Sequence, residues 1–501
     1  MKRRKILVMF LVIVLLCLGV SAMAVNMYDF LPQAYDLRNV DGQRYITAVK
    51  SQCVPDQLWN SVGLCWAFSS IASFESSLLK QGIVTDPESP EANLSPWHLG
   101  CYVGYNHPNY DFNDSPVGNP PIPIGYQLDS TMQFGWGGSA LFTVDWLATG
   151  KGLVLEDQAP LPLDRMRARE TLIPPQEDLP THYMLRKGLV YERQDYASDE
   201  EYRNVIKAAL MKYGAIASPM FLGPPDFPGQ IGESFWRDDN YTDYYCDSEE
   251  LVNNLVHLVA IAGWDDTREI DNAPAPGAWL IKDSMGHDFH DEGYFWISYY
   301  DTVFLKGYSY SVILVADSGI GYDPSRYQTY ESALSRPVAG SSMYESDGYD
   351  SAGLDSWACA RFTGTQDGFL KAVGLVTVNN NEQVAINIFS SWDESEQMPC
   401  GLILSDVISV EEKGYHVIDL SQMVRVVEGE EFVIAIGFSF NPSGSREPLV
   451  FVLGEEHLIQ PGRTYRTSFS ADSGFGEWVD YTDIREHSVF FVQGIMSKTS
   501  Q

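Results

Sequence analysis

A cysteine, a histidine and an aspartate in this 501-residue chain are of the types that together can cleave an amide bond by nucleophilic attack. Cys65 opens a segment whose apolar residues recur at helical spacing and which ends near Gly82, and this pattern predicts a helix that begins at the cysteine. The N-terminus of a helix favours a thiolate over a thiol. Cys65 is therefore a candidate nucleophile if a base lies near it; the alternative is a small buried residue of a core helix.

Two later segments supply a candidate base and a residue to orient it. His257 opens an apolar run that is typical of a buried strand, and Asp283 directly follows the segment AWLIK. A reactive cysteine followed much later by a histidine and an asparagine or aspartate is the pattern of thiol-dependent proteases.

Six motifs, in the same order, resemble those of the papain-like cysteine proteases and span roughly residues 31–305. They are AVKSQ, GLCWAFSS, LSPWHL, GWGGSA, VHLVAIAGWDD and AWLIKDSMG with the following GYFWIS. The resemblance implies that Cys65 attacks the scissile carbonyl and that His257 pairs with the thiolate and protonates the leaving amine. It also implies that Gln52 and the backbone N–H of Cys65 stabilise the oxyanion. Twelve residues separate Gln52 from Cys65, more than is usual in the family, so Gln57 is the alternative oxyanion residue.

The third catalytic position departs from the family's pattern. Asp283 stands where the family has asparagine, and Met285 and Phe289 replace two tryptophans. A carboxylate can orient an imidazole through its N–H, and its charge raises the pKa of that histidine. We therefore expect a secreted or surface endopeptidase with a Cys-His-Asp site and an altered pH profile. The alternatives are an inactive papain-fold adhesion protein, which binds carbohydrate or protein, and another acyl-transfer enzyme such as a transglutaminase-like protein.

The N-terminus and the net charge restrict where this chain acts. Basic residues at positions 2–5, an apolar run over 6–20 and small residues before position 25 predict a secretory signal at residues 1–24, with an uncleaved membrane anchor as the alternative. Removing it takes away four positive charges and moves the formal net charge from −34 to −38. Such acidity argues against nucleic acid or an anionic membrane surface as partner, and we expect contact with a membrane only through the N-terminal signal.

Six cysteines lie beyond the signal: Cys53, Cys65, Cys101, Cys246, Cys359 and Cys400. A secreted protein can form disulfides, and the pairs expected first are Cys53 with Cys101 and Cys359 with Cys400. The cysteines and histidines do not have zinc-ligand spacing. His287 and His290 lie among acidic residues, which indicates a polar loop. We expect neither a metal nor another cofactor.

The predicted fold class is α+β. Residues 25–318 are expected to form a two-lobed papain-like domain, with a helical lobe and a β-barrel lobe. Helices are predicted over Ala140 to Gly150 and, from a capping box at Ser198 and Glu201, as far as Tyr213.

Residues 319–501 are expected to form an antiparallel β-sandwich, because short apolar runs alternate there with turn residues. The segments GYHVIDL, VEGEEFVIAIGF and PGRTYRTS with EWVDY resemble the lectin-like domain that follows papain-type domains in some prokaryotic secreted or surface proteins. The expected partners are protein or peptide substrates for the first domain and a cell-surface carbohydrate or protein for the second. Trp357, Trp392 and Trp478 are candidates for a sugar-binding surface or for core positions.

Overall fold

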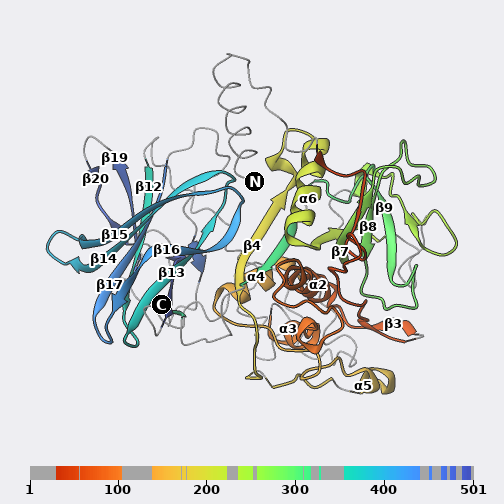
Figure 1. Cartoon of the computed structure of the whole chain (residues 1–501), viewed down its shortest axis with the longest axis horizontal. Helices are drawn as coiled ribbons and strands as arrows, with labels where there is room; N and C mark the ends of the chain where they lie inside the picture. Colours follow the sequence, from red (N-terminus) through yellow and green to blue (C-terminus); the bar gives the residue numbers. More distant parts are fainter. Residues whose placement is uncertain are drawn as a thin grey trace, which may run out of the picture.

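The computed structural model describes residues 30–55, 57–103, 138–170, 172–176, 178–222, 235–251, 257–307, 310–317, 327–328, 355–439, 451–453, 464–470, 474–480 and 488–497. Figure 1 shows helices packed beside strands in one half of the molecule, a second half made of strands, and strand β4 between them. The predicted signal at residues 1–24 lies outside the described residues. No helix in the ranges given above is long and apolar enough to cross a membrane.

The central helix of the first half is α2 (Cys65–Lys80), which begins at the residue that the apolar periodicity predicted. Nearly every side chain of α2 is buried, because the helix contacts helices on one side and strands of the sheet on the other. Gly138 lies so close to it that a Cβ at that position would come within 2.5 Å of the Trp66 ring. The helix that carries the candidate nucleophile is thus fixed by packing around its whole circumference.

The described residues contain four further α-helices. They are α3 (Pro96–Tyr102), α4 (Ala140–Ala148), α5 (Leu163–Ala168) and α6 (Asp199–Tyr213). Of these, α3, α4 and α6 contact α2. The predicted capping box is present at α6: Ser198 Oγ accepts the N–H of Glu201 at 3.1 Å, and the Glu201 carboxylate accepts the N–H of Ala197 at 2.9 Å. The predictions for α4 and α6 are confirmed within two residues.

A twelve-stranded sheet packs against α2. Its strands in the first half are β1 (Ala34–Asp36), β4 (Leu185–Glu192), β5 (Ile216–Met220), β6 (Asp243–Tyr244), β7 (His257–Asp265), β8 (Ala278–Lys282), β9 (Tyr294–Ser298) and β10 (Tyr310–Ala316). The order runs β4-β10-β5-β7-β8-β9-β6, and β1 also pairs with β7. Strand β7 confirms the strand predicted to begin at His257, and it lies beside β8, the strand that precedes Asp283.

The second half consists of antiparallel strands, as the alternating runs predicted. One sheet has the order β15-β14-β17-β12-β19-β20, with β21 beside β19. Its strands are β12 (Asp355–Thr363), β14 (Glu382–Asp393), β15 (Met398–Val410), β17 (Glu431–Phe438), β19 (Thr464–Ser470), β20 (Gly474–Phe475) and β21 (Val479–Asp480). The remaining strands are β11 (Tyr327–Gln328), β13 (Gly368–Thr377), β16 (Gly414–Val426), β18 (Phe451–Leu453), β22 (Ser488–Phe490) and β23 (Gln493–Ser497).

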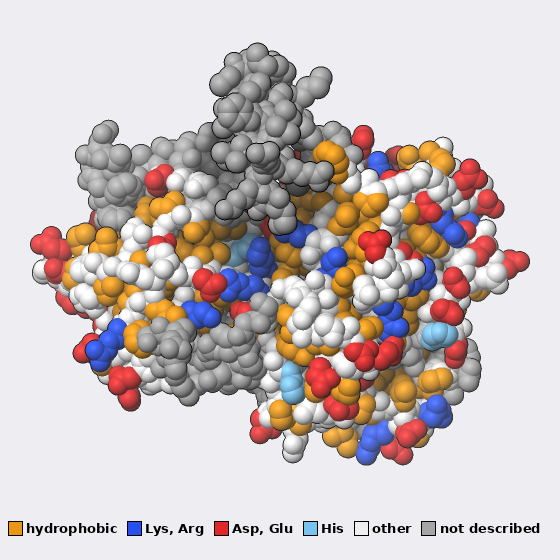
Figure 2. Space-filling view, viewed as in Figure 1, with side chains coloured by type: hydrophobic (Ala, Val, Ile, Leu, Met, Phe, Trp, Pro, Cys, Tyr) orange, Lys and Arg blue, Asp and Glu red, His pale blue; other side chains and the backbone are white. Residues whose placement is uncertain are grey.

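The two halves share backbone hydrogen bonds, which the sequence did not predict. Strands β11, β23, β13 and β16 belong to the twelve-stranded sheet, because β16 pairs with β4. Gly414 makes this approach possible: its φ is +140°, and a Cβ there would lie 2.1 Å from the Gly188 carbonyl oxygen. The side chain of Lys413 is buried against Glu192, at 3.0 Å, and Asp195. Figure 2 shows Lys and Arg side chains gathered on the visible face between the two halves.

The predicted disulfides are wrong, since all six cysteines beyond the signal are free. Cys359 lies in β12 and Cys400 in β15, with β14 and β17 between them. Three strand spacings separate these cysteines by roughly 14 Å, whereas a disulfide requires Cα atoms within about 7 Å. Cys53 instead places its sulfur 3.3 Å from Met285 Sδ, and Cys101 lies in the apolar core on α3.

The three tryptophans of the second half are core residues. Trp357, Trp392 and Trp478 are buried in one apolar cluster, and the Trp392 ring stacks on Tyr465 with centroids 4.2 Å apart. A sugar-binding surface would need exposed aromatic faces, so these residues do not form one.

Candidate active site

Cys65 is the first residue of α2, and the residue is 8% exposed. Burial raises the pKa of the thiol, but the hydrogen bond to His257 and its positive charge lower it, as do hydrogen bonds from the backbone of Leu258 and Trp66. Together these lowering effects exceed the effect of burial, so the pKa of Cys65 lies below its ordinary value. The site therefore favours a thiolate.

His257 connects the sulfur to Asp283. Its Nε2 lies 2.8 Å from Asp283 Oδ1, and both side chains are buried. Burial lowers the pKa of His257, but the charge of Asp283 and the hydrogen bond to it raise the value to about 10, with a smaller contribution from Cys65. Because Nε2 faces Asp283, the other ring nitrogen is the one available to the thiol. The arrangement stabilises a thiolate and an imidazolium side by side.

The pairing of β7 with β8 brings His257 and Asp283 together. Ala260 pairs with Lys282 in antiparallel register. Asp283, one residue after Lys282, therefore lies near the start of β7, where His257 is. The carboxylate also accepts the N–H of Ser284 on Oδ1 at 2.7 Å. Burial raises the pKa of Asp283, but the charge of His257 and hydrogen bonds from His257 and His290 lower it well below its usual range.

Gln52 lies beside the residue that follows Asp283. Its side-chain Oε1 accepts the hydroxyl of Ser284 at 2.8 Å, and its backbone N–H donates to the Ser284 carbonyl at 2.7 Å. Since the amide oxygen is the acceptor, the amide NH₂ is left as a donor group. Gln52 is thus held by two hydrogen bonds to Ser284, one to its side chain and one from its backbone.

The long separation between Gln52 and Cys65 is taken up by a hairpin. Strands β2 (Cys53–Val54) and β3 (Gln57–Ser61) pair, and the N–H of Val62 donates to the Gln52 carbonyl at 3.1 Å. The hairpin therefore brings the chain back beside Gln52 at Val62, three positions before Cys65. Gln57 lies in β3, and its side chain is outside the described residues.

The side chain of His290, which the sequence analysis placed in a polar loop, is only 1% exposed and contacts Asp283. Its Nε2 lies 3.0 Å from Asp283 Oδ2, and its Nδ1 contacts the backbone carbonyl of Tyr241. The loop was identified correctly, but the burial of this one side chain was not. In the sequence, the run of polar residues around His290 indicated a loop. That run does not distinguish the buried His290 from the exposed His287.

Aromatic rings enclose His290. The rings of Phe289, Phe295 and Trp236 have centroids 4.1, 4.7 and 5.0 Å from the imidazole. Phe289, one of the departures from the papain-like pattern noted in the sequence, therefore packs on this second histidine. Met285, another of these departures, contacts Cys53.

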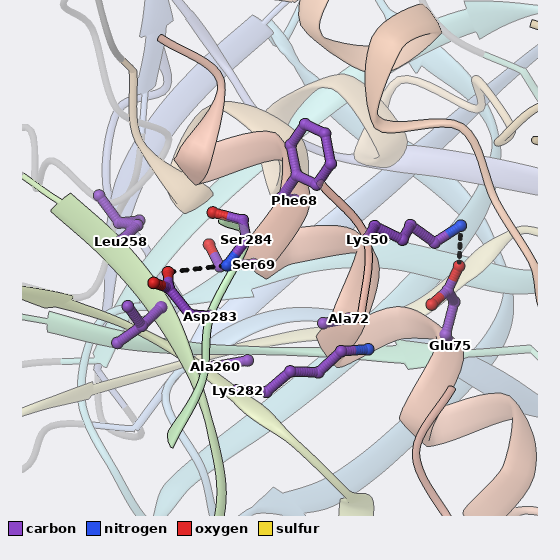
Figure 3. A pocket seen from close by; sticks show the side chains of 11 residues that line it. Lys50, Phe68, Ser69, Ala72, Glu75, Leu258, Ala260, Lys282, Asp283 and Ser284 are labelled. Atoms are coloured by element: carbon purple, nitrogen blue, oxygen red, sulfur yellow. Dashed lines mark hydrogen bonds and ion pairs between the residues drawn. The ribbon is translucent and has the colours of Figure 1, made fainter. Parts of the chain in front are cut away.

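A second buried charge cluster lies behind the site. Glu75 of α2 is fully buried and lies 3.1 Å from Lys50 Nζ, while Lys282 donates to the carbonyl and hydroxyl oxygens of Thr47 at 3.0 and 3.1 Å. Figure 3 shows Lys282 directed toward Lys50 and Glu75, and Asp283 directed away from them toward Ser284 and Leu258. Within the described ranges, no group of three His, Cys, Asp or Glu side chains is placed to hold a metal ion.

Two solved structures share the fold over nearly the whole chain. One is a clostridial cysteine protease, Cwp84, after propeptide cleavage, with a TM-score of 0.63, 19% identity, and coverage of 93% of this chain and 99% of that one. The other contains the cysteine protease and lectin-like domains of Cwp84, a surface layer associated protein of Clostridium difficile; its TM-score is 0.64 at 19% identity, with 93% and 89% covered.

The sequence comparisons are narrower. Residues 341–451 match the family model of the lectin like domain, and no curated protein sequence matches the chain significantly. Together with the solved structures, this match shows that the chain has the fold of a cysteine protease domain combined with a lectin-like domain.

Proposed function

We propose that this chain is a cysteine-type endopeptidase in which Cys65, His257, Asp283 and Gln52 carry the reaction. The observation that supports it most directly is the hydrogen-bonded series from Cys65 through His257 to Asp283 at the N-terminus of α2. The likeness of the fold to Cwp84, a cysteine protease, supports the same conclusion.

The proposed reaction follows from these contacts. The Cys65 thiolate attacks the carbonyl carbon of the scissile peptide, and the resulting oxyanion accepts hydrogen bonds from the Gln52 amide and the Cys65 N–H. The His257 imidazolium gives its proton to the leaving amine, which departs and leaves a thioester. His257 then takes a proton from water, the hydroxide attacks the thioester, and the carboxylic acid product leaves while the thiolate and imidazolium are restored. Asp283 keeps its charge and orients His257 throughout.

The same proposal covers the architecture and location. The helices around α2 form one lobe and strands β5 and β7–β9 the other, with peptide substrate lying where Cys65 and His257 meet. Residues 25–318 would be the peptidase and 319–501 the lectin-like part, which binds a cell-surface carbohydrate or protein. The predicted signal at 1–24 and the surface layer association of Cwp84 support a secreted or surface location.

The first test uses a thiol-directed alkylating probe and an unstructured protein substrate under reducing conditions. Cys65→Ala should lose hydrolysis, because it removes the proposed nucleophile. It should also lose labelling at pH 6, because the other buried thiols described have raised pKa values. Cys400→Ala, which removes a half-exposed thiol of the second half, is the matched control and should keep both.

The outcomes separate the alternatives. Full hydrolysis by Cys65→Ala would overturn the mechanism. Labelling of Cys65 without hydrolysis would favour a non-proteolytic binding protein, and cross-linked products in place of cleaved ones would favour a transglutaminase-like enzyme.

The proposed boundary at 318/319 can be tested by cutting the chain there with a protease that recognises an inserted site. Because β4 and β16 share a sheet and Lys413 is buried against the first half, the two fragments should stay associated on size-exclusion chromatography. Separation of the folded pieces would mean that the shared sheet contributes little to holding the halves together.

A further inference from the structure

The hydrogen bonds of His290 determine its charge. A backbone carbonyl oxygen can only accept, so Nδ1, which faces the carbonyl of Tyr241, carries a hydrogen. An ionised carboxylate also only accepts, so Nε2, which faces Asp283 Oδ2, carries a hydrogen as well. An imidazole with hydrogens on both nitrogens is a cation.

The contact between Nε2 and Asp283 could also be satisfied if Asp283 were protonated. The hydrogen bonds to the carboxylate disfavour that protonation. Oδ1 already accepts from His257 Nε2 and from the N–H of Ser284, at 2.8 and 2.7 Å. A carboxylate that accepts several hydrogen bonds favours its charged form, and the pKa of Asp283 is accordingly held far below the usual range.

The other groups packed on the His290 ring suit a cation. They are the aromatic rings of Phe289, Phe295 and Trp236, within 4.1–5.0 Å of its centroid, and aromatic faces attract positive charge. In the turn before Tyr241, Asp238 directs its carboxylate oxygens to the N–H and hydroxyl of Thr242. Asp283 is thus the ionisable side chain that the described contacts place on His290.

We propose that His290 is a protonated positioning residue that holds Asp283 and provides the counter-charge that an aspartate, but not an asparagine, needs in this position. The inference rests on the proposed peptidase function. With Cys65 as thiolate, His257 as imidazolium and Asp283 as carboxylate, the buried site would carry one excess negative charge. His290 brings that sum to zero, which matters because an uncompensated buried charge is costly.

An asparagine at position 283 would reach the same total charge in a different way. Its oxygen would accept from His257, and its NH₂ would donate to Nε2 of a neutral His290, which keeps its hydrogen on Nδ1 for the Tyr241 carbonyl. Changing residue 283 should therefore change the charge of His290.

The first test measures that charge without any use of activity. Histidine labelled with ¹⁵N reports by NMR which ring nitrogens carry hydrogen, and His290→Gln assigns the signal. At pH 7.5 we expect both His290 nitrogens to be protonated in the wild type and Nε2 to be unprotonated in Asp283→Asn. An unprotonated His290 nitrogen in the wild type would overturn the inference, whether or not the protein proves to be a peptidase.

The second test measures kcat/KM against pH. Without its counter-charge, Asp283 should disfavour the Cys65 thiolate, so His290→Gln should move the acidic limb to higher pH by about one unit. Activity at pH values well below the limb would then fall about tenfold, and the double variant Asp283→Asn with His290→Gln should restore the limb.

The control is His287→Gln, on the same loop but 67% exposed, which should leave the profile unchanged. An acidic limb in His290→Gln identical to the wild type, or no restoration in the double variant, would show that His290 does not compensate Asp283. Hydrolysis that is absent from the wild type while the NMR result holds would reject the peptidase proposal alone.

Discussion

Lys282 and Asp283 are consecutive residues at the end of β8, both buried, yet they belong to charge clusters of different kinds. Side chains alternate between the two faces of a strand, and Figure 3 shows the two side chains pointing to opposite sides. Lys282 lies among Thr47, Lys50 and Glu75, the last a residue of α2. Asp283 lies among His257, His290 and Ser284.

The Lys282 cluster joins segments of the chain through buried polar contacts. Glu75 accepts from Lys50, from the Thr47 hydroxyl and from the N–H of Leu94 at 2.7 Å. Its contacts therefore join α2 to two segments that are distant in sequence. Burial lowers the pKa of Lys282 to about 8, although the charge of Glu75 opposes this effect, so the lysine is charged through most of the physiological range.

The Asp283 cluster is built around two histidines, His257 and His290, whose Nε2 atoms both face the carboxylate. The contacts of the Lys282 cluster hold segments of the chain together, whereas those of the Asp283 cluster orient the imidazole that is proposed to transfer a proton. The comparison therefore predicts that changes on the Lys282 side alter stability and that changes on the Asp283 side alter rate.

The largest effect is expected from Glu75→Gln. It removes the charge that faces Lys282 and leaves Lys50 with only the partly exposed Glu156 as its anion. Breaking a buried ion pair costs about 3–5 kcal/mol of unfolding free energy. Urea denaturation measures this loss. The comparison would fail if stability were unchanged, or if kcat/KM per titrated active site fell as far as in the Asp283 variants.

Asp283→Ala should have the opposite signature. His257 loses its orienting partner, and kcat/KM should fall on the order of 10²-fold, the range for disturbed acid–base catalysis. The loss of unfolding free energy should be smaller than in Glu75→Gln, because both histidines can release a proton when their anion is removed. A large loss of stability with unchanged kcat/KM would place Asp283 in the structural class with Glu75.

Asp283→Asn tests the electrostatics of His257. The carboxylate raises the pKa of this imidazole to about 10, so imidazolium persists below that pH and is lost above it. Removing the charge should lower the pKa, and the alkaline limb of kcat/KM should move down by about 1–3 pH units. An alkaline limb at the wild-type position would mean that the carboxylate does not act on His257.

The smallest effect is expected from Glu156→Gln, the control for Glu75→Gln. Glu156 also contacts Lys50 at 3.1 Å, but its side chain is 31% exposed. Partly exposed ion pairs contribute less than about 1 kcal/mol, and urea denaturation should show a loss of that size. An effect equal to that of Glu75→Gln would mean that burial is not what distinguishes the two carboxylates.

The sequence by itself determined the parts of this protein that depend on neighbours along the chain. Apolar spacing and a following glycine located α2 and put Cys65 at its first residue, and the run after His257 located β7. The capping box located the start of α6. These features are local because helix and strand periodicity, caps and turns involve residues only a few positions apart.

Only the tertiary structure decided which distant residues meet. The hairpin that returns to Gln52, the contact of His290 with Asp283 and the pairing of β4 with β16 all join segments whose separation says nothing about their distance. The free cysteines follow from the same cause, since strand order placed Cys359 and Cys400 three strands apart. Strand register and side-chain packing fix such contacts, and both depend on the whole sequence. Residue types and spacing could therefore predict the nucleophile and its base, but not the contact of the second histidine, His290, with Asp283.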